Sequence, residues 1–190
     1  MNPSLINIAK ISFLSIIAFA LLIYLTAEKP QTTISQLPKT TKLIGYKQPV
    51  DSSAIFKPNS IVAIANHDAL PLLAQIPNVS NIDKNFVLIA NISQAPWAIK
   101  EFVIADKLKN LKKSTKTAFV FDDSGVFSTY FKHSNNDKKY YAIYLLDSKA
   151  NILKISDGNV KDGDFDKNFT KEEIVQKISH SLNEISKLEH

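Results

Sequence analysis

The chain has 190 residues, which suits one domain with an appendage, and its 45% hydrophobic and 22% charged content is ordinary for a globular protein. The net charge of +5 comes from lysine alone. Since the sequence has no arginine, the bidentate arginine contacts that read guanine in DNA are excluded, and we expect no nucleic-acid partner. The sequence also has no cysteine, which excludes disulfides, cysteine-ligated zinc and thiol chemistry.

Residues 1–27 are predicted to be a signal anchor or a signal peptide. Residues 11–25 carry no charge, and they approach the length of about 20 residues that a spanning helix needs if Lys10 places its ammonium group at the membrane surface. The same run fits the apolar part of a signal peptide that is cleaved after Ala27. We favour a retained anchor in the inner membrane. Because Lys10 precedes the apolar run, we expect the remainder of the chain to be extracytoplasmic or periplasmic.

Residues 28–59 are rich in Pro, Thr, Ser, Gln and Lys, and we expect a linker followed by an irregular lead-in. A short strand is predicted at Lys42–Tyr46. The remaining residues, 60–190, are predicted to form one domain.

Strands and helices alternate along residues 60–190. Strands are predicted as short runs rich in β-branched and aromatic residues, and helices by apolar residues at helical spacing. Alternation predicts parallel strands joined by right-handed crossovers, and a final hairpin makes the sheet mixed. We therefore predict an α/β fold with a central mixed sheet flanked by helices. The predicted strands are Ile61–Ala65, Asn85–Ile92, Thr117–Phe121, Tyr140–Leu146 and Ile152–Ile155, and the predicted helices are Ala69–Ile76, Trp97–Lys112, Val126–Phe131 and Thr170–Leu188.

This order of elements resembles the thioredoxin-like fold family, including its TlpA-like and Dsb-like members. In that family the Cys-x-x-Cys redox motif lies between the second of these strands and the following helix, where this sequence reads Ala95-Pro96-Trp97-Ala98. The resemblance implies that Ala95 and Ala98 occupy the two redox positions. A cysteine at a helix N-terminus has a lowered thiol pKa and a second cysteine resolves the mixed disulfide, so two methyl groups leave no redox chemistry.

The family also places a cis-proline just before the fourth strand, beside the motif. Positions 139 and 140 hold Lys139 and Tyr140 instead. Two parts of the redox site are thus missing, which favours natural divergence. The alternative is an oxidoreductase whose cysteines were replaced by alanine, since the final Leu188-Glu189-His190 resembles the start of a purification tag.

An acidic segment near the C-terminus resembles an EF-hand calcium loop. Lys167 stands where the sharp turn requires glycine, and a strand rather than a helix precedes the segment. We expect a solvated acidic loop that ends in a helix cap, with Thr170 and Glu173 spaced as a capping box. Calcium binding is the alternative. The candidate ligands are Asp162, Asp164, Asp166, Asn168 and Glu173.

His67 and Asp68 follow the first predicted strand, at the edge where α/β proteins place their sites. A catalytic pair is conceivable there, but neighbours in sequence rarely point together at a helix start, so we expect these residues to cap the helix. His133 and His180 are expected at the surface.

These observations predict a non-catalytic protein-binding or chaperone-like module that recognises an extended or unfolded protein segment. Pro96 and Trp97, together with the sheet edge near Tyr140, are the expected contacts. A replaced-cysteine oxidoreductase and a calcium-dependent structural protein remain as alternatives. Under the first hypothesis we expect no cofactor.

Overall fold

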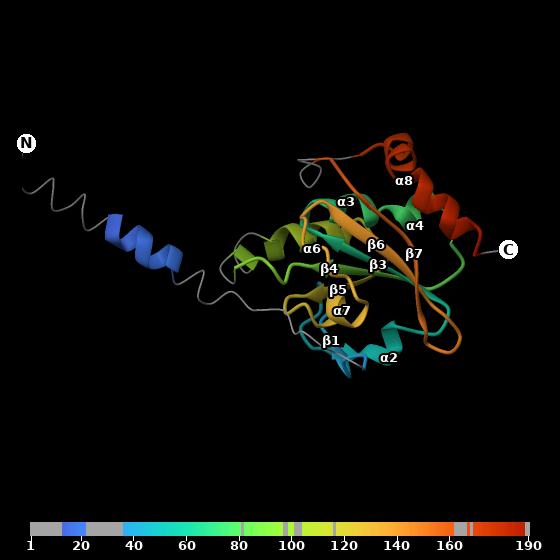
Figure 1. Cartoon of the computed structure of the whole chain (residues 1–190), viewed down its shortest axis with the longest axis horizontal. Coiled ribbons are helices and arrows are strands. Elements are labelled where there is room, and N and C mark those ends of the chain that lie inside the picture. Colours follow the sequence, from blue (N-terminus) through green and yellow to red (C-terminus); the bar gives the residue numbers. More distant parts are fainter. Residues whose placement is uncertain are drawn as a thin grey trace, which may run out of the picture.

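A five-stranded mixed sheet forms the centre of the domain in this computed structural model, which describes residues 13–21, 36–80, 82–96, 99–100, 104–115, 117–161, 167 and 169–188. The strand order is β5-β4-β3-β6-β7, with β3 parallel to β4, β4 parallel to β5, and β6 antiparallel to both β3 and β7 (Figure 1). This arrangement confirms the predicted mixed sheet. The strands are β3 (Ser60–Asn66), β4 (Phe86–Asn91), β5 (Ala118–Asp122), β6 (Tyr140–Leu146) and β7 (Ile152–Asn159).

Both faces of the sheet are buried. Along β3, Ile61, Ala63 and Ala65 pack on one face, while Val62 and Ile64 pack on the other, as the two-residue period of a strand requires. One face packs against α3, α4, α6 and α8, and the other against α2 and α7 (Figure 1). The helices are α2 (Ser52–Ile55), α3 (Leu70–Leu73), α4 (Ile76–Val79), α6 (Ala105–Lys113), α7 (Val126–Tyr130) and α8 (Lys171–Ser186).

The lead-in before β3 is packed onto the domain. Its strands β1 (Thr40–Thr41) and β2 (Val50–Asp51) pair with each other, and Leu43 forms an antiparallel bridge with Val120 on the edge strand β5. Leu43, Ile44 and Phe56 are buried in the two cores. The predicted strand at Lys42–Tyr46 is wrong, because the Leu43 bridge is followed by a turn in which Gly45 has φ 89°.

Several other elements differ in length from their predictions. Strand β7 continues to Asn159, beyond the predicted end at Ile155, and pairs with the start of β6. Gly158 permits this close pairing, since a Cβ there would lie 2.9 Å from the Tyr141 hydroxyl. The predicted helix Trp97–Lys112 corresponds in its second half to α6, whereas residues 97, 98 and 101–103 lie outside the described part. The predicted capping box of α8 is confirmed.

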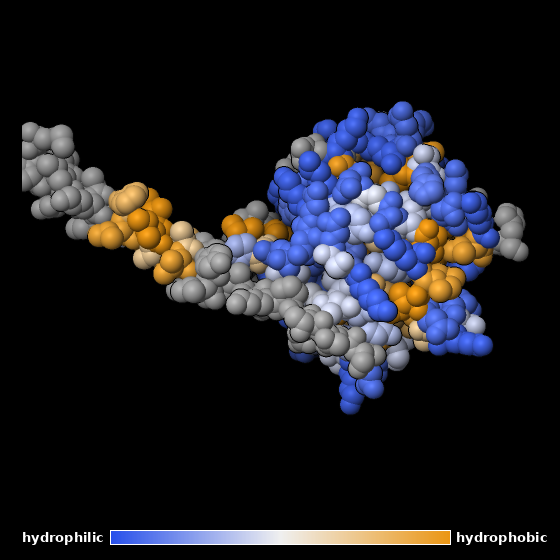
Figure 2. All heavy atoms as spheres, in the orientation of Figure 1, coloured by the Kyte–Doolittle hydropathy of each residue, from blue (hydrophilic) through white to orange (hydrophobic). Residues whose placement is uncertain are grey.

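Residues 13–21 of the N-terminal segment are helical, and their apolar side chains are exposed (Figure 2). Within the described residues, none of the helices combines the length and the apolar character that crossing a membrane requires. Most of the segment assigned to residues 1–27 lies outside the described part, so a signal anchor stays a prediction.

Candidate binding cleft

The three parallel strands end in polar residues that lie next to each other. Asn66 at the end of β3 pairs in register with Asn91 at the end of β4, and Asn91 pairs with Asp122 at the end of β5. All three side chains are buried although each follows an apolar run. Buried polar groups must find hydrogen-bond partners, so this edge of the sheet organises the loops that cover it.

Asn66 is the centre of a buried hydrogen-bond network. Its Nδ2 donates to the carbonyl oxygens of Asn135 (2.8 Å) and Asp137 (2.6 Å), and its Oδ1 accepts from Asn91 Nδ2 at 2.8 Å. The Oδ1 atom also lies 3.1 Å from His133 Nε2. The loop before β6 is therefore attached directly to the end of β3.

The same network fixes the proton on His133. Because Asn66 Oδ1 can only accept, Nε2 of His133 carries the hydrogen and Nδ1 carries the lone pair. The side chain is 5% exposed, and burial lowers its pKa to about 4. His133 is thus neutral at physiological pH. Its predicted surface position is wrong, since its ring packs 5.1 Å from that of Tyr140 and contacts Asn66 in the interior.

On the other side of Asn91, Asp122 binds the start of helix α7. Its carboxylate accepts hydrogen bonds from the backbone N–H groups of Phe127 (3.3 Å) and Ser128 (2.8 Å) and from the Ser128 hydroxyl (2.7 Å). Burial raises the pKa of Asp122, and this effect outweighs the lowering by the hydrogen bonds. The carboxylate fixes the first turn of α7 against the sheet.

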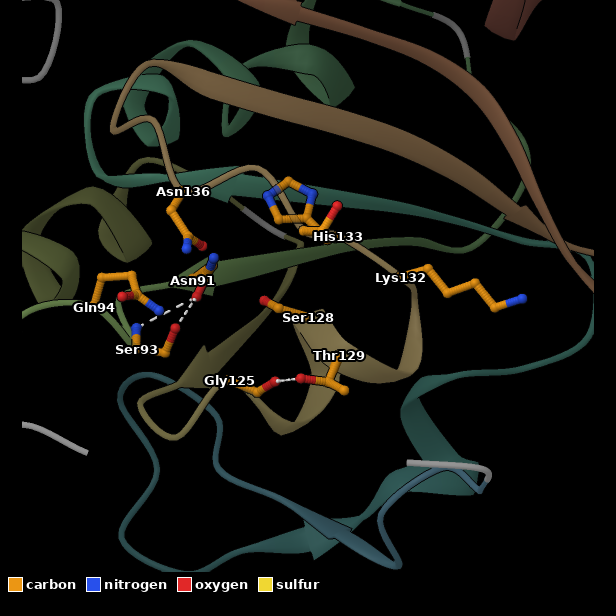
Figure 3. Close-up of a pocket in the computed structure, with 10 residues that line it drawn as sticks. Asn91, Ser93, Gln94, Gly125, Ser128, Thr129, Lys132, His133 and Asn136 are labelled. Carbon is orange, nitrogen blue, oxygen red and sulfur yellow. Dashed lines mark hydrogen bonds between the residues drawn. The ribbon is translucent and has the colours of Figure 1, made fainter. Parts of the chain in front are cut away.

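Two adjoining cavities open at this edge, and we call them together the cleft. The larger, of about 420 Å³, is lined largely by polar side chains, including Ser128, Thr129 and His133 (Figure 3). The smaller, of about 280 Å³, is lined by polar and apolar side chains, and its surface is the more apolar of the two. Among the described residues, three line both cavities and therefore form their common border, namely Asn91, Gln94 and Asn136. The apolar lining of the smaller cavity comes from Ile92, Ala95, Ile99 and Ile104.

Gln94 and Asn136 differ from the buried amides at this border. Both are exposed, and neither side-chain carboxamide has a hydrogen-bond partner within the described part of the chain. Figure 3 shows both side chains pointing toward Asn91, one from the turn after β4 and the other from the loop before β6. Their donors and acceptors are available to a ligand.

Ala95 and Pro96 form the corner after β4. Ala95 is half-buried, and its N–H donates to Ile92 O at 3.0 Å. The carbonyl oxygen of Pro96 accepts from the N–H groups of Ile99 and Lys100, each at 3.0 Å. Trp97 and Ala98 lie outside the described residues. The assignment of the redox positions to Ala95 and Ala98 stays a prediction.

A second corner, after β3, is bonded directly to the loop before β6. The N–H of Asp68 donates to Lys138 O at 2.8 Å, whereas Ala95 faces this loop only across the smaller cavity. No peptide bond among the described residues is cis. Because the sequence has no cysteine at all, neither corner can carry thiol chemistry.

His67 and Asp68 point toward each other, contrary to the prediction. His67 Nδ1 lies 2.7 Å from Asp68 Oδ1, and Lys138 Nζ lies 3.5 Å from Asp68 Oδ2. The short helix η1 (His67–Ala69) has no side-chain cap. The predicted capping role is wrong, because the backbone bond from Asp68 to Lys138 holds the carboxylate beside the ring. His180 is exposed, as expected.

Tyr140 does not lie on a lateral edge of the sheet. It begins β6, which pairs on both sides, and its hydroxyl donates to Asp157 at 2.6 Å and accepts from Lys154 at 3.1 Å. Its ring packs beside His133 at the same end of the sheet as the cleft. Tyr140 therefore supports the wall behind the larger cavity.

The proposed calcium ligands are mostly outside the described residues, which include neither 162–166 nor 168. The side chain of Glu173 accepts from Thr170 N at 2.8 Å in the capping box. In the parts that the structure does describe, no three His, Asp or Glu side chains gather as a metal site would require. Calcium binding stays a prediction.

The sequence interpretation missed the border residues and the network behind them. The available signal was that each of the three parallel strands ends in Asn or Asp, at Asn66, Asn91 and Asp122. Parallel strands bring these ends together, which indicates a shared polar cluster. No sequence pattern marked Gln94 or Asn136.

Comparisons with known proteins concern the arrangement of the elements. No protein-family model and no curated protein matches the chain. Among solved structures, it is similar to a secreted Mycobacterium tuberculosis disulfide oxidoreductase homologous to E. coli DsbE, with 14% identity, a TM-score of 0.42, and coverage of 74% of this chain and 94% of that one.

The exposed lipoprotein thioredoxin Etrx1 of Streptococcus pneumoniae has 11% identity and a TM-score of 0.40 over 74% of this chain and 97% of its own. DsbF of M. tuberculosis has 10% identity and a TM-score of 0.40 over 81% and 99%, respectively. The chain thus resembles thioredoxin-like proteins in the course of its backbone, while its cleft residues have to be interpreted from their own geometry.

Proposed function

We propose that this chain is a binding module without thiol redox chemistry that holds an extended protein segment at the carboxyl edge of its sheet. One observation carries the proposal: two cavities adjoin there, and their common border exposes the unpaired carboxamides of Gln94 and Asn136. Since the chain has no cysteine, a client cannot be held by a mixed disulfide. The contacts must be noncovalent.

Pro96 and Trp97 are further proposed contacts, because they follow Ala95 in the sequence and Ala95 lines the smaller cavity. Proline and tryptophan side chains can offer an apolar surface to a partner. Tyr140 contributes by supporting the wall behind His133, since its hydroxyl is already bonded to Asp157. Replacing Trp97 by alanine is expected to weaken client capture.

We also propose that the domain acts outside the cytoplasm and that its N-terminal segment attaches it to the inner membrane. The support is the uncharged run at residues 11–25, preceded by Lys10. Alkaline phosphatase fused after His190 should be active in cells, because that enzyme needs an oxidising compartment. An inactive fusion of normal abundance would place the domain inside.

Photo-crosslinking tests the binding function directly. Benzoylphenylalanine at position 94 should crosslink to reduced, carboxymethylated lactalbumin, a permanently unfolded protein. The matched control carries the same group at Leu153, which is 52% exposed. Leu153 pairs with Leu145, whose other neighbour is Ile61, so it lies at the opposite end of the sheet. Equal crosslinking from the two positions, or none from position 94, would refute a client site in the cleft.

A further inference from the structure

We propose that Gln94 and Asn136 form a carboxamide clamp on the main chain of an extended, uncharged peptide whose side chains alternate between apolar and polar. This inference rests on the proposed function and specifies the client. In it, the smaller cavity takes an apolar side chain and the larger cavity takes the polar neighbour.

The buried network positions both arms of the clamp. Asn66 bonds the carbonyl oxygens on either side of Asn136, which are those of Asn135 and Asp137. Asn91 accepts from the N–H (3.3 Å) and the hydroxyl (2.8 Å) of Ser93, directly before Gln94. The bond between the Asn91 and Asn66 side chains joins the two loops. The backbone positions of the two loops that carry the free carboxamides are thus held before a ligand arrives, which lowers the entropic cost of binding.

The chemistry of the arms selects an amide. A carboxamide offers one acceptor oxygen and two donor hydrogens, and its complement is a group that has both a carbonyl and an N–H. A peptide main chain supplies both at every residue. Among the described residues no carboxylate lines either cavity, whereas Lys132 lines the larger and Lys138 the smaller, so a basic side chain is disfavoured.

The larger cavity favours side chains that donate hydrogen bonds. The hydroxyl of Ser128 donates inward to Asp122, that of Thr129 donates to Gly125 O, and that of Ser93 donates to Asn91. The hydroxyl oxygens of Ser93 and Ser128 keep only their lone pairs for a ligand. An Asn or Ser side chain of the client meets that requirement.

Strand geometry links the two cavities to alternate residues of the client. In an extended chain, successive side chains point in opposite directions. A main chain that follows the border at Gln94 and Asn136 therefore sends one side chain toward Ile92 and Ile104 in the smaller cavity. The next side chain enters the larger cavity. A repeat of leucine and asparagine fits both.

Fluorescence anisotropy with a fluorescein-labelled (Leu-Asn)3 hexapeptide tests the clamp on the full-length chain in a nonionic detergent. Gln94→Leu and Asn136→Leu should each weaken binding about tenfold, the effect of one lost hydrogen bond. The matched control Gln48→Leu, at an exposed carboxamide of the lead-in, should bind as the unmodified protein does. N-methylation of the peptide main chain should weaken binding about tenfold to the unmodified protein, but not further to the double variant.

The outcomes separate the clamp from the proposed function. If the unmodified protein binds the peptide and both leucine variants bind it equally well, the clamp is wrong and the binding function stands. The clamp is also wrong if position 94 crosslinks to unfolded lactalbumin but the hexapeptide does not bind. If neither ligand binds, both proposals fall. Circular dichroism melting curves confirm that each variant is folded.

Discussion

The inner wall and the rim of the cleft are built from the same chemical group but use it differently. Asn66 and Asn91 are buried, and their carboxamides bond to backbone and side-chain groups of both loops. Gln94 and Asn136 are exposed, and within the described residues their carboxamides bond to nothing. Burial therefore separates a structural role from a binding role. A buried amide needs hydrogen-bond partners within the protein, whereas an exposed amide is solvated by water and can bind a ligand.

This contrast predicts a gradient of effects on stability. Substitutions in the inner wall leave buried donors and acceptors without hydrogen-bond partners, and they should lower the free energy of unfolding. Substitutions at the rim release groups that water already solvates, and they should change binding alone. The variants below run from the centre of the network to the rim.

Asn66→Ala should have the largest effect. It removes the acceptor of Asn91 Nδ2 and His133 Nε2 and the donor to two loop carbonyls. At roughly 1–3 kcal/mol for each buried polar group left unpaired, with some of them rehydrated through the cleft, we expect a loss of about 4 kcal/mol. Urea denaturation monitored by circular dichroism measures it. A loss below about 1 kcal/mol would mean that the inner wall is not a structural network.

His133 should make stability depend on pH between its two pKa values, about 4 in the folded chain and 6.5 as the reference for the unfolded chain. The unfolded state binds the extra proton within this window, so the stabilisation is fully present above pH 6.5 and is lost as the pH falls to 4. At 1.36 kcal/mol per pKa unit, the loss amounts to about 3 kcal/mol.

The variant His133→Phe isolates this contribution, because phenylalanine keeps a planar ring and has no proton to bind. The unfolding free energy of the unmodified protein minus that of this variant should fall as the pH falls from 7 to 4, because only the unmodified protein loses the contribution of His133. Urea denaturation at intervals across this range gives the curve. A difference that stays constant with pH would show that His133 is protonated in the folded chain as readily as in the unfolded one.

The contrast between wall and rim also explains what the sequence could predict. The five strands follow from runs of apolar residues, because each buried strand needs them whatever its neighbours are. The burial of His133 does not follow, since Lys132 and Ser134 on either side are typical of a loop. Its ring is buried by Asn66, 67 positions earlier in the chain, and by Tyr140.

The pairing of His67 with Asp68 was missed for a similar reason. The backbone N–H of Asp68 donates to the carbonyl oxygen of Lys138, which lies in a loop that is distant in sequence, and this bond places the carboxylate. Local patterns encode elements and caps, such as Thr170 with Glu173, whose partners lie within one turn. A site built from the ends of three strands and two loops depends on tertiary contacts that no local window contains.

Ser93→Ala tests an intermediate position, between wall and rim. The hydroxyl of Ser93 makes a single bond to Asn91 Oδ1 at 2.8 Å, and the backbone N–H keeps its own bond to the same atom. We expect a loss of about 1 kcal/mol, the value of one buried hydrogen bond. Ser134→Ala is the matched control, because this exposed serine makes no side-chain hydrogen bond within the described chain. Equal effects of the two changes would contradict the gradient.

The rim variants should have the smallest effect on folding. Gln94→Leu and Asn136→Leu remove carboxamides that water solvates in the free protein, and exposed substitutions of this kind usually change the free energy of unfolding by less than about 0.5 kcal/mol. The same two variants are those expected to weaken peptide binding about tenfold. Urea denaturation of the proteins used for anisotropy therefore separates a lost contact from a damaged fold. A destabilisation above about 1 kcal/mol would assign the rim to the structural network, and the weaker binding would then follow from the fold.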